Sequence, residues 1–215
     1  MILKVLKLNT GLGDATNCYI VADEKTKEAF IIDPGAEPEK IIEMINILKV
    51  KVKYIILTHC HGDHSGAISE VKDKLGGKIL IHRMDAEGLY NEDINLSYYI
   101  GMNNVELEAD SRLDDEDKIH LGDIEFEIIH TPGHTKGGIC VYCKECNMIF
   151  TGDTLFRGTW GMTDLPTGNF EDIIHSITNK IMILPENTIV YPGHGKSTII
   201  KEEKSIYLEL KPREY

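Results

Sequence analysis

The sequence has no run that approaches the ~20 apolar residues a membrane-spanning helix needs. The segment before Asn9 carries Lys4 and Lys7 and is too short to form the hydrophobic centre of a signal peptide. Low-complexity linkers that would separate domains are also missing. We therefore expect a soluble, cytoplasmic protein that folds as a single domain over residues 1–215.

Basic residues are scarce relative to acidic ones. The chain has 23 Lys and Arg against 35 Asp and Glu, which gives a formal net charge of −12. A field of this sign repels phosphate backbones and anionic lipids, so nucleic acids and membranes are not expected as partners. This argument concerns the average charge and leaves room for a local basic patch.

Cysteine occurs five times, and an odd number without a secretory signal indicates reduced thiols. Cys140, Cys143 and Cys146 have a spacing found in metal and iron–sulfur sites. However, alternation along a strand sends Cys140 and Cys143 to opposite faces, and no fourth ligand is apparent. We expect these thiols to pack in a hairpin. Four histidines outside the glycine-containing turns are expected to be ordinary core or surface residues: His82, His120, His130 and His175.

Apolar runs and amphipathic segments alternate along the chain. The pattern indicates parallel strands with helices packed on the sheet, an α/β fold. It recurs in outline after residue 118, which indicates two similar halves. Residues 85–117 between them are acidic and are expected to form a connecting excursion that could act as a lid. Strands are expected at residues 18–22, 29–32, 50–57, 78–82, 118–121, 124–129, 138–143, 148–150 and 188–191, and helices at residues 36–48, 65–75 and 169–184.

The segment Thr-His-Cys-His-Gly-Asp-His-Ser-Gly at residues 58–66 follows an apolar strand. Neutral imidazole and carboxylate are ligands that first-row divalent metals accept. A strand end followed by a glycine-containing loop lets these side chains converge on one volume. The segment therefore predicts a metal site formed by His59, His61, Asp63 and His64. Cys60 lies between two of these residues and is expected to point away and pack.

Three more candidates each follow a predicted strand within a turn of small residues: His134, Asp153 and His194. Ligands of open α/β sheets bind at this carboxyl edge of the strands. Together with the first segment, these residues provide five imidazoles and two carboxylates. That number suits a binuclear site with one shared carboxylate.

The ordered His and Asp set resembles the metallo-β-lactamase superfamily. The motifs TPGHTKGG, FTGDTLFRGTWGMTDLP and VYPGHG narrow the resemblance to glyoxalase II and short hydroxyacylglutathione hydrolase-like proteins. The resemblance implies an αββα sandwich, with two β-rich sheets face to face, helices outside and two divalent metal ions at one edge. It assigns His59, His61 and His134 to one ion, Asp63, His64 and His194 to the other, and Asp153 to both.

The resemblance also implies hydrolysis of a small thioester by a metal-bridging hydroxide, with Asp63 as the catalytic carboxylate. Zinc is the preferred ion, with iron and manganese as alternatives. Arg157, Trp160 and Met162 are the expected substrate contacts. Met162 stands where relatives carry a basic anchor for a substrate carboxylate, and Arg157 is the expected replacement. The C-terminal helical region with which glyoxalase II binds glutathione is expected to be absent.

Other functions remain open. Sulfur dioxygenases of the same superfamily share the Gly-x-Thr-Asp element at residues 161–164 and use one iron, here at His59, His134 and Asp153. Metal-dependent phosphodiesterases and nucleases can have identical ligands, although the acidic charge weighs against them. A true β-lactamase and a non-catalytic binding module are the least favoured. Measuring the metal content of the purified protein would distinguish a dioxygenase with one iron from a hydrolase with two metal ions.

Overall fold

The computed structural model describes residues 1–11, 15–102, 105 and 107–207. Its strands form two six-stranded sheets, each built from one half of the sequence. The strands of the first sheet follow the chain in order: β1 (Ile2–Leu8), β2 (Thr16–Ala22), β3 (Glu28–Ile32), β4 (Lys51–Ile56), β5 (Lys78–His82) and β6 (Ser111–Leu113). β1, β2 and β3 pair antiparallel, and β3 to β6 pair parallel, as the strand–helix alternation predicts.

The second sheet also follows chain order. Its strands are β7 (Lys118–Leu121), β8 (Ile124–His130), β9 (Ile139–Cys143), β10 (Met148–Gly152), β11 (Ile189–Pro192) and β12 (Thr198–Ile199). Only β10 and β11 pair parallel, because a helical segment crosses over between them, and the other neighbours are antiparallel. Both sheets are therefore mixed.

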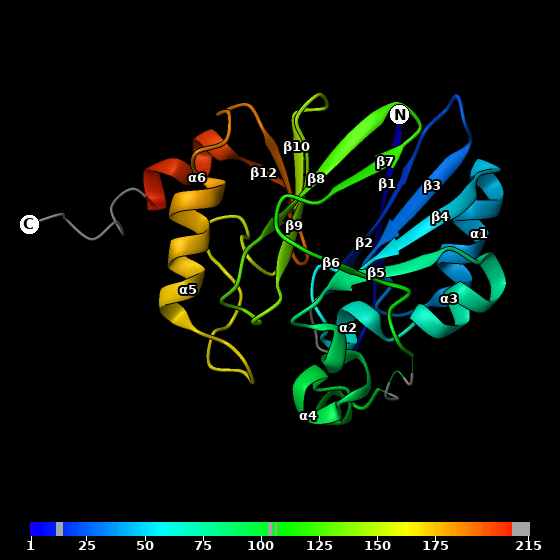
Figure 1. The fold of residues 1–215 in the computed structure, drawn as a ribbon, viewed down its shortest axis with the longest axis horizontal. Helices are drawn as coiled ribbons and strands as arrows, with labels where there is room; N and C mark the ends of the chain where they lie inside the picture. Colours follow the sequence, from blue (N-terminus) through cyan, green and yellow to red (C-terminus); the bar gives the residue numbers. More distant parts are fainter. Residues whose placement is uncertain (12–14, 103–104, 106, 208–215) are drawn as a thin grey trace, which may run out of the picture.

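The helices lie outside the paired sheets, as Figure 1 shows. α1 (Pro38–Leu48) and α3 (Ile68–Leu75) cover the first sheet, and α5 (Phe170–His175), the π-helical η3 (Ser176–Ile181) and α6 (Ile200–Tyr207) cover the second. The short α2 (Gly62–Ser65) and α4 (Glu92–Asn95) lie together at one end of the molecule. The order helix, sheet, sheet, helix is the predicted αββα sandwich.

Three apolar layers hold these elements together. Between the sheets, the rings of Phe30 and Phe126 meet edge to face with centroids 4.8 Å apart. The two outer layers join each sheet to its own helices. Side chains along β2 alternate between two of these layers. Ile20 faces the helices, while Tyr19 and Val21 face the other sheet.

The predicted cysteine hairpin is confirmed. Cys140 packs with the helices of the second sheet, and Cys143 faces the space between the sheets. Cys146 lies in the turn between β9 and β10. Cys60 is fully buried in the core of the first sheet, as predicted.

Helix ends follow local sequence signals. Pro38 occupies the first turn of α1, where its fixed φ is compatible with a helix. The side chain of Asn169 accepts a hydrogen bond from the backbone N–H of Asp172 and caps α5. The predicted helix at 65–75 begins later, at Ile68, because residues 62–65 form the separate turn α2.

Three strands, helix α6 and part of the excursion differ from the expectations: β1, β6, β12 and α6 were not predicted. β1 was not predicted because its lysines interrupt the apolar alternation, yet seven of its residues pair with β2. β6 lies within the acidic excursion and completes the first sheet through pairing with β5. The rest of the excursion holds η1 (Ala86–Tyr90), α4 and η2 (Tyr98–Ile100). Within the described residues, no helix is both long and apolar enough to span a membrane.

Candidate metal centre

The seven predicted ligands meet at one edge of the sandwich, although they come from four segments of the sequence. They lie on turns that follow β4, β8, β10 and β11, and on α2, whose first residue is Gly62. Each of these strands ends at this edge, so its next few residues reach the same space. The residues are His59, His61, Asp63, His64, His134, Asp153 and His194.

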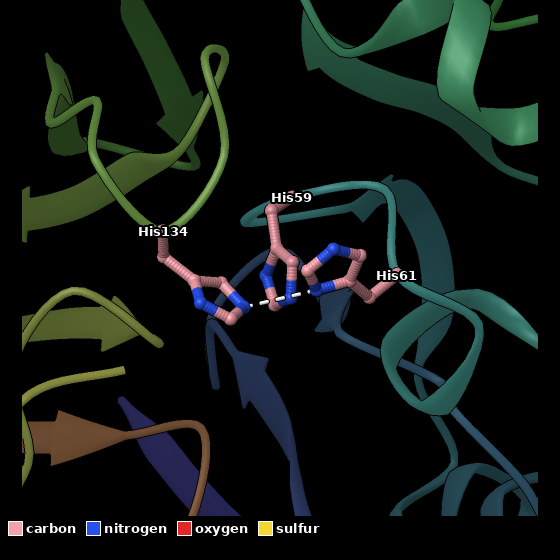
Figure 2. Close-up of side chains that lie close together, drawn as sticks. All are labelled: His59, His61 and His134. Atoms are coloured by element: carbon pink, nitrogen blue, oxygen red, sulfur yellow. Dashed lines mark hydrogen bonds between the residues drawn. The ribbon is translucent and has the colours of Figure 1, made fainter. Parts of the chain in front are cut away.

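His59, His61 and His134 form the first donor group, with one ring nitrogen from each within 4.8 Å of the others. Figure 2 shows the three rings converging from two loops. Nδ1 of His61 lies 2.9 Å from Nε2 of His134. Nε2 of His59 is buried without a hydrogen-bond partner in the described part of the chain. Buried ring nitrogens without protein partners are costly unless another ligand satisfies them.

Asp63, His64 and His194 form the second group. Nε2 of His194 lies 3.2 Å from Oδ2 of Asp63 and 3.2 Å from Nε2 of His64. His64 is fully buried. This group therefore also points three donor atoms at one small volume.

Asp153 lies between the two groups. Its Oδ2 is 3.6 Å from Nε2 of His134 in the first group and 3.5 Å from Nε2 of His194 in the second. Its Oδ1 is 3.3 Å from Nε2 of His64. The carboxylate therefore has the position of a shared ligand.

Protein acceptors orient two of the imidazoles. Nδ1 of His64 donates to Oδ2 of Asp33 at 2.9 Å, and Nδ1 of His134 donates to the carbonyl of Met162 at 2.7 Å. Because Nδ1 carries the proton in each ring, Nε2 is left with a lone pair that faces the centre. Metal-binding histidines are commonly oriented through their other nitrogen in this way.

Burial and charge shape the protonation of the centre. Burial lowers the pKa of His61 to about 3 and holds that of His59 well below its usual value, so both rings are neutral, as ligands must be. Burial also opposes protonation of His64, but the carboxylates of Asp153, Asp63 and Asp33 outweigh it and raise the pKa. The carboxylates around His64 therefore stabilise positive charge, and the same charges would favour binding of a metal cation.

Gly193 lets the strand end approach the centre closely. A Cβ atom at this position would lie 2.1 Å from Oδ1 of Asp153 and 2.6 Å from Cε1 of His64. A larger residue would therefore displace donors from both sides. The donor types, the unpartnered His59 nitrogen and this close approach fit a centre for divalent metal ions.

A cavity of about 950 Å³ opens over the centre. Arg157, Trp160 and Met162, the substrate contacts expected from the sequence, all line it. Met162 also contributes its carbonyl to His134, a role that the sequence did not indicate. The acidic excursion supplies Leu96 and Ile100 to the wall, so it covers part of the cavity.

Comparison with known proteins agrees with this geometry. A family model described as the metallo-beta-lactamase superfamily matches residues 11–194. The chain belongs to this superfamily.

Three members illustrate the range of its similarities. Hydroxyacylglutathione hydrolase GloC of Haemophilus influenzae is 36% identical over 190 residues, which are 87% of this chain and 89% of GloC. The crystal structure of BLEG-1, a B3 metallo-beta-lactamase, is 33% identical and covers 98% of this chain and 100% of its own, with a TM-score of 0.89. The di-iron-bound form of TTHA1623 is 29% identical and covers 94% of this chain and 98% of its own, with a TM-score of 0.82.

Two buried aspartates of this protein were not identified as functional residues from the sequence. Asp33 accepts hydrogen bonds from Thr58 and His64, although nothing in its local sequence marks it as functional. Asp85 was placed in the acidic excursion, but it accepts hydrogen bonds from Cys60 N at 3.2 Å, Thr135 Oγ1 at 2.7 Å and Gly137 N at 2.7 Å. Asp85 thereby ties the loop of His59 and His61 to the loop of His134. Only its position shortly after the end of β5 at His82 could have drawn attention to it.

Proposed function

We propose that this protein is a hydrolase of small thioesters that works with two divalent metal ions. The observation that carries the proposal is a pair of three-donor groups with Asp153 between them, at the floor of a partly apolar cavity. The similarity to hydroxyacylglutathione hydrolase GloC supports the thioester as the substrate class.

In this proposal His59, His61 and His134 hold one ion, and Asp63, His64 and His194 hold the other, with Asp153 shared. Such ions lower the pKa of coordinated water and polarise an ester carbonyl, so no Ser or Cys nucleophile is needed. The chain's own residues position these parts. Asp33 and the Met162 carbonyl fix the tautomers of His64 and His134.

The cavity positions the substrate above this floor. The indole of Trp160 packs against Tyr207 with ring centroids 5.9 Å apart, which gives it a fixed place in the wall. Phe156 meets His194 edge to face at 5.9 Å. Aromatic walls of this kind exclude water from the reacting carbonyl and favour an apolar acyl or thiol portion.

Zinc is the preferred ion, with iron and manganese as alternatives, because His and Asp accept all three. The di-iron-bound form of TTHA1623 supports two ions in a related structure. A single-iron sulfur dioxygenase would need only His59, His134 and Asp153. The complete second group, with His64 oriented by Asp33, supports two ions over one.

Hydrolysis of β-lactams is the second candidate. It is favoured by the similarity to BLEG-1, a B3 metallo-beta-lactamase. Water activated at the same seven residues, once they hold metal ions, would hydrolyse a β-lactam amide in place of a thioester. The two activities are separated by assaying S-acyl thioesters and a chromogenic cephalosporin with one metal-loaded preparation.

The decisive experiment combines metal content with that assay. Elemental analysis of protein purified without added metal is expected to show about two ions per chain. Thioester hydrolysis that chelation abolishes and metal restores would support the proposal. Full metal loading without hydrolysis of any thioester would contradict it, and one iron per chain with oxygen uptake on a persulfide would favour the dioxygenase.

A further inference from the structure

Three cationic residues line the cavity above the metal centre. Lys7 lies at the end of β1, Arg157 follows β10, and Lys196 follows β11. Among the described lining residues the acidic ones are Asp63 and Asp153, and both belong to the metal centre. The cavity mouth is therefore locally basic, although the chain as a whole has a net charge of −12.

The three cations are not equally available. The guanidinium of Arg157 lies 3.6 Å from the carboxylate of Glu202, which shares its charge. Lys7 and Lys196 form no ion pair with any residue in the described part of the chain. Their charges remain free for a ligand.

Lys7 is held beside the turn that carries His194. Its Nζ donates to the carbonyl of Gly195 at 2.5 Å. This contact places the ammonium against the residue that separates His194 from Lys196. Two of its three protons remain for another acceptor. Lys7, on β1, and Lys196, in the turn after β11, thus both lie on the His194 side of the cavity.

The opposite side of the cavity is apolar. Ile100 lies against Gly62, which is next to His61, and Met162 lies at His134 through its carbonyl. Leu96 and Leu165 also line the cavity. The cavity is therefore asymmetric, with apolar side chains beside the first donor group and lysines beside the second.

We propose that Lys7 and Lys196 form a subsite for an anionic group of the substrate, a carboxylate or a phosphate. This rests on the proposed thioester hydrolase function and specifies its substrate class. The substrate is an anionic thioester whose charged end lies toward His194 and whose apolar portion lies against Ile100 and Met162. The anchoring role expected of Arg157 then belongs to the two lysines.

Binding can be measured without catalysis, because Trp160 is the only tryptophan of the chain and lines the cavity. Its fluorescence would report titration of the metal-loaded protein with 3-(butylthio)propanoate, 2-(butylthio)ethyl phosphate and the neutral 3-(butylthio)propanamide. We expect one or both anions to bind about tenfold more tightly than the amide, and the preferred anion identifies carboxylate or phosphate. The preference should weaken as salt is added.

The lysines are tested by the double variant K7Q/K196Q, in which the preference for the anion should fall about tenfold. The variant K7R/K196R retains both charges and should keep the preference, which separates charge from folding. Lys4→Gln, an exposed lysine on β1 outside the cavity, is the matched control. An anion preference that persists in K7Q/K196Q would overturn the subsite, because the anion would then bind elsewhere, for example at the metal ions.

Hydrolysis provides the second readout. S-butyryl-3-mercaptopropanoate is anionic and S-butyryl-N-acetylcysteamine is neutral. The ratio of their kcat/KM values should fall about tenfold in K7Q/K196Q, mainly through KM for the anionic ester. If the wild type hydrolyses both esters without preference, the subsite proposal fails and the hydrolase function stands. If it hydrolyses no thioester, the hydrolase function fails, and the fluorescence titration still decides whether the lysines bind anions.

Discussion

The carboxylate of Asp33 accepts a hydrogen bond from Nδ1 of His64 at 2.9 Å, and both side chains are buried. The same carboxylate accepts the backbone N–H of Thr58 at 2.8 Å and its hydroxyl at 2.7 Å. Asp33 therefore links the end of β4 to α2, the two segments that supply four of the seven proposed ligands. Both of its oxygens are used, so its role depends on a carboxylate.

Replacing Asp33 by Asn leaves one acceptor oxygen where two are needed. The variant D33N should bind the second ion about 10- to 100-fold more weakly, because His64 loses its orienting acceptor. Competition with a chromogenic chelator measures this affinity. Asp123→Asn changes an exposed carboxylate in the turn between β7 and β8 and is the control. Equal affinity of both ions in D33N and the wild type would contradict the orienting role.

Removal of one donor from the second group tests the binuclear assignment. His194→Ala should retain about one ion per chain and lose thioester hydrolysis, because only the first group stays complete. His120→Ala, on the exposed side of β7, should keep two ions. Elemental analysis after removal of loose metal by gel filtration provides the measurement. Two ions in the His194 variant would show that His194 is not a ligand.

Asp85 joins the two histidine loops through three hydrogen bonds. Burial raises the pKa of this carboxyl, whereas the bonds from Thr135 and Gly137 oppose the shift. Asp85→Ala should reduce the free energy of unfolding by about 3 kcal/mol, because buried donors on both loops lose their acceptor. Urea unfolding of the metal-free protein measures this cost, with Asp123→Ala as the control. A cost below about 0.5 kcal/mol would mean that the loops keep their places without Asp85.

The metal ligands and the layered fold were predictable because their signals are local. The His59 to His64 segment places four donor residues within six positions, and the strands around it are continuous apolar runs. β1 was missed because its stability comes from pairing with β2, a contact between segments that no single stretch reveals. Asp33 and Asp85 were missed for the same reason, since their partners lie 25 to 52 residues away. Likewise, the Lys7 and Gly195 contact joins positions 188 residues apart.

The stacked pair His82 and His130 predicts a pH dependence of stability. Their rings lie 4.0 Å apart, at the ends of β5 and β8. Burial, followed by the positive charge of His130, lowers the pKa of His82 to about 4, whereas a histidine in an unfolded chain has a pKa of about 6.5. Between these values the unfolded state binds more protons than the folded state does. The contribution of His82 is therefore complete above about pH 6.5 and is lost as the pH falls toward about 4.

The variant H82F keeps an aromatic ring in the stack and removes the titrating group. Urea unfolding of the metal-free wild type and variant, between about pH 4.5 and 7, measures the difference in their slopes. The free energy of unfolding of the wild type should fall more steeply with acid than that of H82F, because only the wild type has the His82 imidazole. The residues of the metal centre are the same in both proteins, so their titration cancels in this comparison. His120→Phe replaces an exposed histidine and should leave the wild-type slope unchanged. Parallel curves for the wild type and H82F would show that His82 titrates alike in the folded and unfolded chains.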